Sequence, residues 1–132
     1  MMTTASRGTV LVVDDDPRNR KLIETLLRAD AYTVVGVDSG PAALAAAAAD
    51  PPDLVLLDLM MPDMDGFEVV RRLKADALNR RLPIVMITAL DDDASRTRLA
   101  AAGIDWVLTK PVDRWQLRTC LESVLNRRQD LT

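Results

Sequence analysis

The stretch TVLVVDDDP, residues 9–17, decides the fold because it joins an apolar segment to three aspartates and then to the start of a helix. Its first five residues are apolar or β-branched without polar alternation, which is typical of a strand covered on both faces. Asp16 followed by Pro17 is a helix N-cap followed by a first-turn proline. The stretch therefore predicts a strand–helix unit, with Asp14 and Asp15 directly after the strand.

The same strand–helix order recurs along the whole chain. Continuous apolar runs predict further buried strands, and the run that contains Gly36 is expected nearer the sheet edge because glycine weakens a strand. Because a parallel return needs a crossover, which a helix supplies, five such repeats predict a doubly wound α/β fold with a parallel sheet between helices. The predicted strands are 9–13, 33–37, 54–57, 84–87 and 107–108, and the predicted helices begin at 17, at 39–41 (ending at about 49), at 66, at about 93 (ending at 102) and after 113.

Length and charge set the class of protein. The 132 residues correspond to about one domain, and we expect a single domain over residues 1–132, with a core at about 9–126 and short flexible ends. The 17 basic and 20 acidic residues give a net charge of −3, which disfavours nonspecific binding to nucleic acid or anionic lipid. No apolar run is long enough to cross a membrane, so no membrane insertion is expected. Cys120, the one cysteine, cannot form an intramolecular disulfide, and a soluble cytoplasmic protein is expected.

The chain contains no histidine, so it has no imidazole to act as general base, metal ligand or phosphate carrier. This excludes hydrolases with a Ser-His or Cys-His pair and nearly all zinc sites that use histidine. The four aromatic residues are too few for a base-stacking platform. The chemistry must therefore rest on carboxylates, hydroxyls and amines.

Polar side chains follow four of the predicted strands. Asp14 and Asp15 follow the first, Asp58 the third, Thr88 the fourth and Lys110 the fifth. Because ligands of such folds bind at the carboxyl ends of the strands, we expect these groups on one rim. Three carboxylates there would repel one another without a cation, and oxygen ligands of this kind suit Mg²⁺. A hydroxyl and an ammonium opposite the metal can hold the oxygens of a phosphoryl group.

In that arrangement a carboxylate is the only credible nucleophile. Asp58 is the candidate because it comes from a central strand, whereas Asp14 and Asp15 are better placed to hold the metal. Taken singly, each residue also has an ordinary explanation: an Asp pair before a helix is typical of a cap with a solvated neighbour, Thr88 ends a strand, and Lys110 is a surface lysine. The prediction depends on their convergence.

Four motifs in order make the chain resemble the receiver domain of a two-component response regulator, from about Thr9 to Asn126. The resemblance implies a five-stranded parallel sheet in the order 2-1-3-4-5 with five helices, a flavodoxin-like three-layer sandwich. The motifs are VVDDDP at 12–17, LVLLDLMMPDMDG at 54–66, ITAL at 87–90 and LTKP at 108–111.

The resemblance also implies that Asp58 accepts a phosphoryl group from a phosphohistidine on a sensor histidine kinase or phosphotransfer protein. Asp15 and Asp58 would coordinate Mg²⁺ directly, Asp14 mainly through water, and Met60 through its backbone carbonyl. The residues implied to bind phosphoryl oxygens are Thr88, Ala89 and Lys110.

In the same family, the threonine hydroxyl moves toward the modified aspartate as the switch, which assigns this role to Thr88. Pro62 and Gly66 would shape the loop after Asp58. A cis peptide bond would precede Pro111.

Two features depart from the family pattern. The aromatic residue that usually stands three positions before the lysine is replaced by Val107, and Trp106 lies one residue earlier, on the opposite side of the strand. We hypothesise that activation passes through the Thr88 loop and the fourth helix without a ring rotation, or that Trp106 forms part of the exposed partner surface. The residues two after the aspartate and two after the threonine are Met60 and Leu90, which cannot orient a water molecule, so a long-lived phosphorylated state is predicted.

The sequence does not identify the partner that reads the phosphorylated state. The readout surface implied by the family is about 93–127, and its partner is a downstream effector protein or a fused effector domain, with a homodimer on phosphorylation also left open. The stretch ITALDDDASR resembles receivers that are fused to cyclic-dinucleotide enzymes more than those fused to DNA-binding modules, and no direct contact with nucleic acid is expected. Asp91, Asp92 and Asp93 are interpreted as a solvated loop and a helix start.

Two other classes fit less well. A phosphatase of the haloacid dehalogenase type needs an acid two residues after the nucleophile, where Met60 stands. A flavodoxin-like electron carrier needs a hydroxyl-rich phosphate loop after the first strand, where this chain has DDDP. We therefore expect no enzyme activity beyond self-phosphorylation from phosphohistidine and slow self-dephosphorylation.

Overall fold

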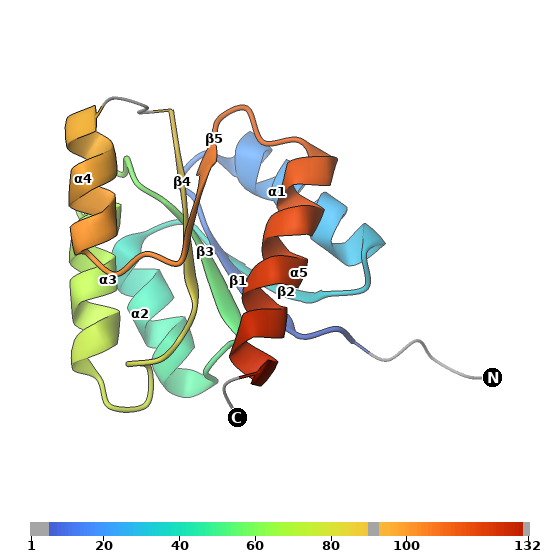
Figure 1. Cartoon of the computed structure of the whole chain (residues 1–132), viewed down its shortest axis with the longest axis horizontal. Coiled ribbons are helices and arrows are strands. Elements are labelled where there is room, and N and C mark those ends of the chain that lie inside the picture. The colour runs from blue at the N-terminus through green and yellow to red at the C-terminus, as the bar shows by residue number, and fades with distance from the viewer. Residues whose placement is uncertain (1–5, 90–92, 131–132) are drawn as a thin grey trace.

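The computed structural model describes residues 6–89 and 93–130, which form one five-stranded parallel sheet covered by helices on both faces (Figure 1). The strands lie in the order β2-β1-β3-β4-β5, so the predicted fold class and strand order are confirmed. In chain order the elements are β1 (Thr9–Val13), α1 (Pro17–Ala29), β2 (Thr33–Val37), α2 (Gly40–Ala49), β3 (Leu54–Asp58), α3 (Gly66–Ala75), β4 (Ile84–Thr88), α4 (Asp93–Ala101), β5 (Trp106–Thr109) and α5 (Arg114–Asp130).

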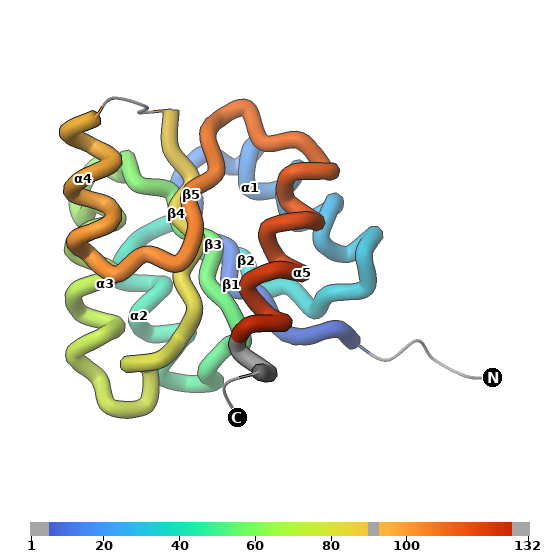
Figure 2. The backbone as a smooth tube through the Cα atoms, viewed as in Figure 1, coloured from blue at the N-terminus to red at the C-terminus, as the bar shows by residue number. Residues whose placement is uncertain are grey.

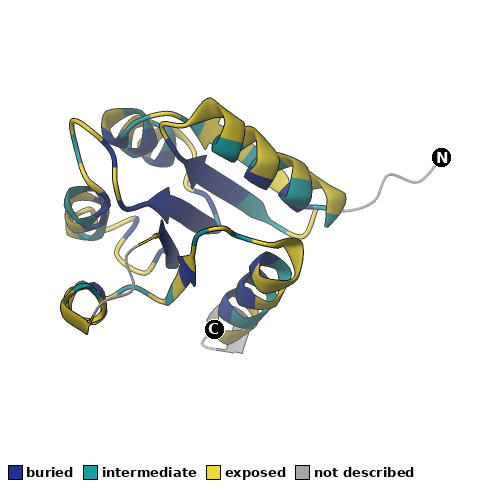
Figure 3. Ribbon diagram, turned by 90° about the horizontal axis from the view of Figure 1, so that it is seen from above, coloured by how far each residue is buried: buried dark blue, intermediate teal, exposed yellow. Residues whose placement is uncertain are grey.

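The sheet separates two apolar cores because successive side chains of a strand point to opposite faces. Helices α2, α3 and α4 cover one face, and α1 and α5 cover the other (Figure 1). Leu11, Leu57 and Met86 belong to the first core, whereas Val12 and Leu56 belong to the second. The central strands are buried while the outer sides of the helices are exposed (Figure 3), as the continuous apolar runs predict.

The helix starts agree with the predicted caps. The Asp16 carboxylate accepts a hydrogen bond from the backbone N–H of Arg18, and Ser39 caps α2 in the same way. The Asp113 carboxylate accepts one from the backbone N–H of Gln116 at 2.7 Å. None of the helices in the described ranges is long and apolar enough to cross a membrane.

Three strands extend further than the sequence predicts: β5 is one residue longer at each end than the predicted 107–108, and β3 and β4 each gain one residue at the carboxyl end. Asp58 and Thr88 were expected just after their strands, but they are the last residues of β3 and β4. The reason is the ladder of the parallel neighbours, in which Asp58 pairs with Ile87 and Thr88 pairs with Thr109. Both functional side chains are therefore fixed by regular strand backbone. The predictions for Leu90, Asp91, Asp92 and the chain ends lie outside the described residues.

Cys120 gives a direct test of the core formed by α1 and α5. Its side chain is fully buried, and burial raises the pKa of the thiol to about 12. Because the thiolate is the reactive form, we expect no reaction with an aromatic disulfide reagent at about pH 8 in the native state. Addition of denaturant should release one reactive thiol per chain, measured by absorbance. Rapid stoichiometric labelling of the native protein would contradict the packing of α5.

Candidate functional site

Three carboxylates meet at the carboxyl edge of the sheet. Asp14 and Asp15 follow β1, and Asp58 ends the adjacent strand β3. One oxygen of each carboxylate lies within 4.8 Å of the others. The loops that follow β1, β3 and β5 lie at this same edge, at the top of the view in Figure 2. The predicted convergence of the three aspartates is therefore confirmed.

Burial makes this acidic cluster electrostatically unfavourable by itself. The exposed fractions of Asp14 and Asp58 are 2% and 3%, whereas Asp15 is exposed to solvent. Burial raises the pKa of the Asp58 carboxyl, the ammonium of Lys110 opposes this shift, and the charge of Asp14 adds to it. The cluster offers only oxygen donors, with one carboxylate open to solvent, and such a donor set fits a hard divalent cation that keeps part of its water shell.

Within the described ranges, Lys110 and Met60 donate to the Asp58 carboxylate. The Lys110 ammonium lies 3.3 Å from Asp58 Oδ1, and the backbone N–H of Met60 donates to the same oxygen at 3.2 Å. Met60 itself is 63% exposed, so it contacts Asp58 through its backbone while most of the residue faces solvent. The first turn of the loop after Asp58 therefore folds back onto the carboxylate.

Gly66 allows the loop after β3 to close against the sheet. Its backbone N–H donates to the carbonyl of Leu59 at 2.9 Å. A Cβ at Gly66 would lie 3.0 Å from the Leu59 Cα and 3.2 Å from the Asp58 carbonyl oxygen, which is too close for an ordinary contact. This close approach agrees with the loop-shaping role expected of Gly66.

Thr88 and Lys110 lie beside Asp58 across the next strands. Thr88 is completely buried at the end of β4, and its carbonyl accepts a hydrogen bond from the backbone N–H of Lys110 at 2.9 Å. Ala89 follows it and is exposed. The peptide bond between Lys110 and Pro111 is cis, as expected. The structure thus brings Asp58, Thr88 and Lys110 to one edge, while their chemical roles stay predictions.

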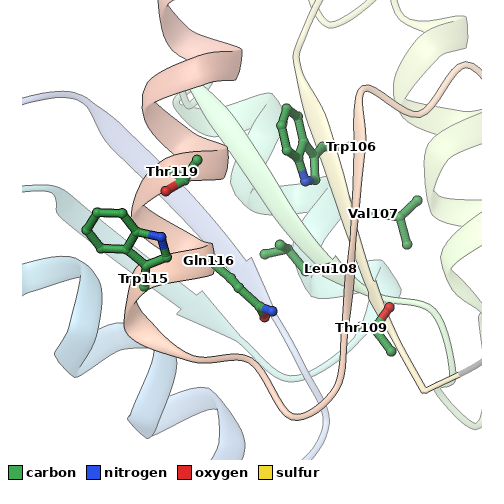
Figure 4. Close-up of a pocket in the computed structure, with 7 residues that line it drawn as sticks. All are labelled: Trp106, Val107, Leu108, Thr109, Trp115, Gln116 and Thr119. Atoms are coloured by element: carbon green, nitrogen blue, oxygen red, sulfur yellow. The ribbon is translucent and has the colours of Figure 1, made fainter.

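Trp106 and Val107 lie on opposite sides of β5, as predicted (Figure 4). Trp106 is half-buried and packs against the core under α1 and α5, whereas Val107 is 37% exposed on the other face. Trp106 borders a groove of about 350 Å³ between β5 and α5, which Trp115 closes on the helix side. Trp106 is therefore only partly available to a partner.

Sequence reasoning missed two residues of α1 that contact the cluster. The Asn19 side-chain amide donates to Asp14 Oδ2, and Arg20 Nη1 donates to the Asp14 backbone carbonyl at 2.7 Å. The signal in the sequence was weak, because polar residues in the first turn of a helix are common on solvent-facing sides. The signal that could have found them is their spacing, because Asn19 and Arg20 stand five and six residues after Asp14.

The raised pKa of Asp58 predicts how stability depends on pH in the absence of divalent cations. The folded state holds the Asp58 proton more tightly than the unfolded chain, so this contribution to stability is complete below the ordinary carboxyl pKa and is lost as pH rises through the raised pKa. Because burial is the main cause of the raised pKa and the charge of Asp14 adds to it, Asp58→Asn should be more stable than the wild type at about pH 7.

Thermal melting checks this expectation, and the difference between the two proteins should shrink toward about pH 3.5, where the carboxyl is protonated. Asp63→Asn, an exposed change in the same loop, is the matched control and should leave the melting temperature unchanged. Lower stability of Asp58→Asn at neutral pH would contradict the electrostatic description.

Comparisons with known proteins agree on one family. The model of the response regulator receiver domain matches residues 10–122. The response regulator PleD of Caulobacter vibrioides is 50% identical over 104 residues, which cover 79% of this chain and 23% of PleD. This chain thus spans less than a quarter of the length of that relative.

Solved structures give the same result. The chemotaxis response regulator CheY4 of Vibrio cholerae superposes with a TM-score of 0.84 and 30% identity, over 92% of this chain and 99% of CheY4. The receiver domain of the sensor histidine kinase PA1611 of Pseudomonas aeruginosa PAO1, solved with a magnesium ion coordinated in its active site cleft, has a TM-score of 0.84 and 32% identity, over 90% of this chain and 98% of that domain.

Proposed function

This chain belongs to the response regulator receiver domain family, and on that premise we propose that Asp58 accepts a phosphoryl group from a phosphohistidine on a sensor histidine kinase or phosphotransfer protein. The observation that carries the proposal is the surroundings of Asp58. It is a buried carboxylate that ends a central strand, with an ammonium 3.3 Å away and two more carboxylates within 4.8 Å. A cytoplasmic location is part of the proposal.

Apart from one proton supplied by water, the transfer needs no reactant other than Asp58 and the phosphohistidine. A carboxylate oxygen of Asp58 attacks the phosphorus, the O–P bond forms as the P–N bond breaks, and the imidazole of the partner leaves and takes up a proton. This chain has no histidine of its own, so the donor group must come from the partner. The product is an acyl phosphate, which water can later hydrolyse.

We assign the cation site to the carboxylates of Asp14, Asp15 and Asp58 and to the backbone carbonyl of Met60. Mg²⁺, when bound, supplies the positive charge that lets a phosphoryl group approach three carboxylates. The magnesium ion in the PA1611 receiver domain supports this choice of metal. The exposed carboxylate of Asp15 faces solvent, which suits an ion that keeps water ligands.

Lys110 and Thr88 would hold the phosphoryl oxygens once the group is on Asp58. The Lys110 ammonium already contacts Asp58, so only a small movement separates its ion pair from a contact with the phosphoryl group. The backbone N–H of Ala89, the exposed residue directly after β4, is assigned to a third oxygen. Movement of Thr88 toward the acyl phosphate would then change the readout surface at 93–127.

The output partner in this proposal is a downstream effector protein or a fused effector domain. PleD supports the fused form because this chain matches under a quarter of it. The proposed switch comprises Thr88, which is buried, and Trp106 and Val107, which lie on opposite sides of β5. Dimerisation on phosphorylation is left to experiment.

Phosphorylation by a small donor tests the acceptor assignment. Incubation with acetyl phosphate and Mg²⁺ should add one phosphoryl group to the wild type, measured by intact mass. Asp58→Asn should abolish the gain because the amide is not a nucleophile. The matched control Asp63→Asn should behave as the wild type. Failure of the wild type to gain a phosphoryl group, or an equal gain by Asp58→Asn, would refute the proposal.

The apolar residue two positions after Asp58 predicts slow loss of the phosphoryl group. Met60 cannot orient an attacking water molecule, so we expect the acyl phosphate to persist for minutes or longer after the donor is removed. Met60→Asn places a hydrogen-bonding group at the same exposed position and should accelerate the decay, followed by intact mass over time. Decay of the wild type within seconds, or no effect of Met60→Asn, would contradict this role.

A further inference from the structure

Asp14 is the most completely bonded residue of the acidic cluster. Its backbone N–H donates to the carbonyl of Val37 at 3.1 Å, and its own carbonyl accepts from Arg20 at 2.7 Å. Its carboxylate accepts from the backbone N–H of Asp16 at Oδ1, at 2.9 Å, and from the amide of Asn19 at Oδ2. Each carboxylate oxygen therefore has a donor that fixes its direction.

The donors on the two oxygens differ in kind. The N–H of Asp16 belongs to the turn itself, because Asp16 is also the N-cap of α1. Asn19 is the third residue of α1, and its side chain reaches back beyond the cap to Asp14. Of these two donors to the carboxylate, that of Asn19 is the one that a side-chain substitution can remove without changing the backbone or Asp14.

An amide is well suited to hold a carboxylate that must also serve a cation. A lysine at position 19 would form an ion pair with Asp14 and compete with the metal, and an aspartate would add to the repulsion. The neutral amide occupies one acceptor position of Asp14 and leaves other lone pairs of the carboxylate available. In addition, it fixes the rotamer of Asp14 in the cluster before any ion arrives.

We propose that Asn19 is a positioning residue of the cation site, whose amide holds the Asp14 carboxylate in the orientation that serves Mg²⁺. This inference rests on the proposed function and extends it to a residue outside the ligand set. Asn19 acts through Asp14, to which its amide donates. Groups that orient metal ligands typically change metal affinity by ten- to a hundredfold when they are removed.

The test measures Mg²⁺ binding directly. Titration calorimetry with magnesium chloride should give a Kd for Asn19→Ala and for the nearly isosteric Asn19→Leu that is about tenfold or more above the wild type. Thr25→Ala is the matched control, because Thr25 lies on α1 and its hydroxyl donates only to the carbonyl of Lys21, at 2.8 Å. Its Kd should equal that of the wild type.

A second readout separates positioning from a general weakening of the fold. At saturating Mg²⁺, the rate at which Asn19→Ala gains a phosphoryl group from acetyl phosphate should return to within about twofold of the wild type, because ligand orientation is then restored by mass action. A Kd within twofold of the wild type in both Asn19 variants would overturn the inference. Where the wild type is phosphorylated, a rate of Asn19→Ala that Mg²⁺ does not restore would overturn it as well.

The experiment separates failure of this inference from failure of the proposed function. If the wild type binds Mg²⁺ and the Asn19 variants bind it weakly, the inference stands even where Asp58 accepts no phosphoryl group. If Asp58 is phosphorylated and the Kd is unchanged in both variants, the inference alone fails. Absence of Mg²⁺ binding by the wild type would overturn it as well.

Discussion

Repulsion among the carboxylates of Asp14, Asp15 and Asp58 is the interaction on which the rest of the site depends. Asp14 and Asp58 are almost completely buried, so water screens their charges poorly. The ammonium of Lys110, at 3.3 Å from Asp58, offsets part of this charge. What remains is a concentration of negative charge that the folded chain tolerates because backbone hydrogen bonds fix the residues that carry it. This imbalance is the physical basis of the cation dependence that we propose for the phosphoryl transfer.

The register of the sheet sets the distances within the cluster. Val13 of β1 pairs with Leu57 of β3, so the residues that follow them, Asp14 and Asp58, come side by side. The same strands are held by apolar side chains on both faces, and a slip of one residue would turn each of these side chains to the wrong core. The two cores therefore stabilise the arrangement of charges that would otherwise separate. Function at this edge is possible because the apolar packing below it specifies one register.

Most of the fold and the main site residues are predictable from the sequence, for reasons that particular residues make clear. The continuous apolar run before Asp14 has one interpretation, a strand buried on both faces, and the polar residues after such strands must meet at one edge. The sequence predicts the ends of β3 and β4 one residue too early because Asp58 and Thr88 are polar. Their place in the strands depends on pairing with residues far along the chain, which a local pattern does not reveal. The contact of Asn19 with Asp14 was not predictable, since an asparagine in a first helical turn gives the same pattern whether its side chain faces solvent or reaches back.

The replacement of the usual aromatic residue by Val107 changes how a signal can leave the site. Val107 is a small β-branched side chain on the face opposite Trp106, and its stiff χ1 leaves little to rotate. The ends of β4 and β5 are joined by backbone pairing, including the hydrogen bond from the Lys110 N–H to the Thr88 carbonyl at 2.9 Å. On the other side, α4 buries Leu99, and its Arg98 stacks on the Phe67 ring of α3 at 3.9 Å. In the proposed switch, movement of Thr88 therefore reaches β5 through main-chain hydrogen bonds, a route that needs no rotating aromatic side chain.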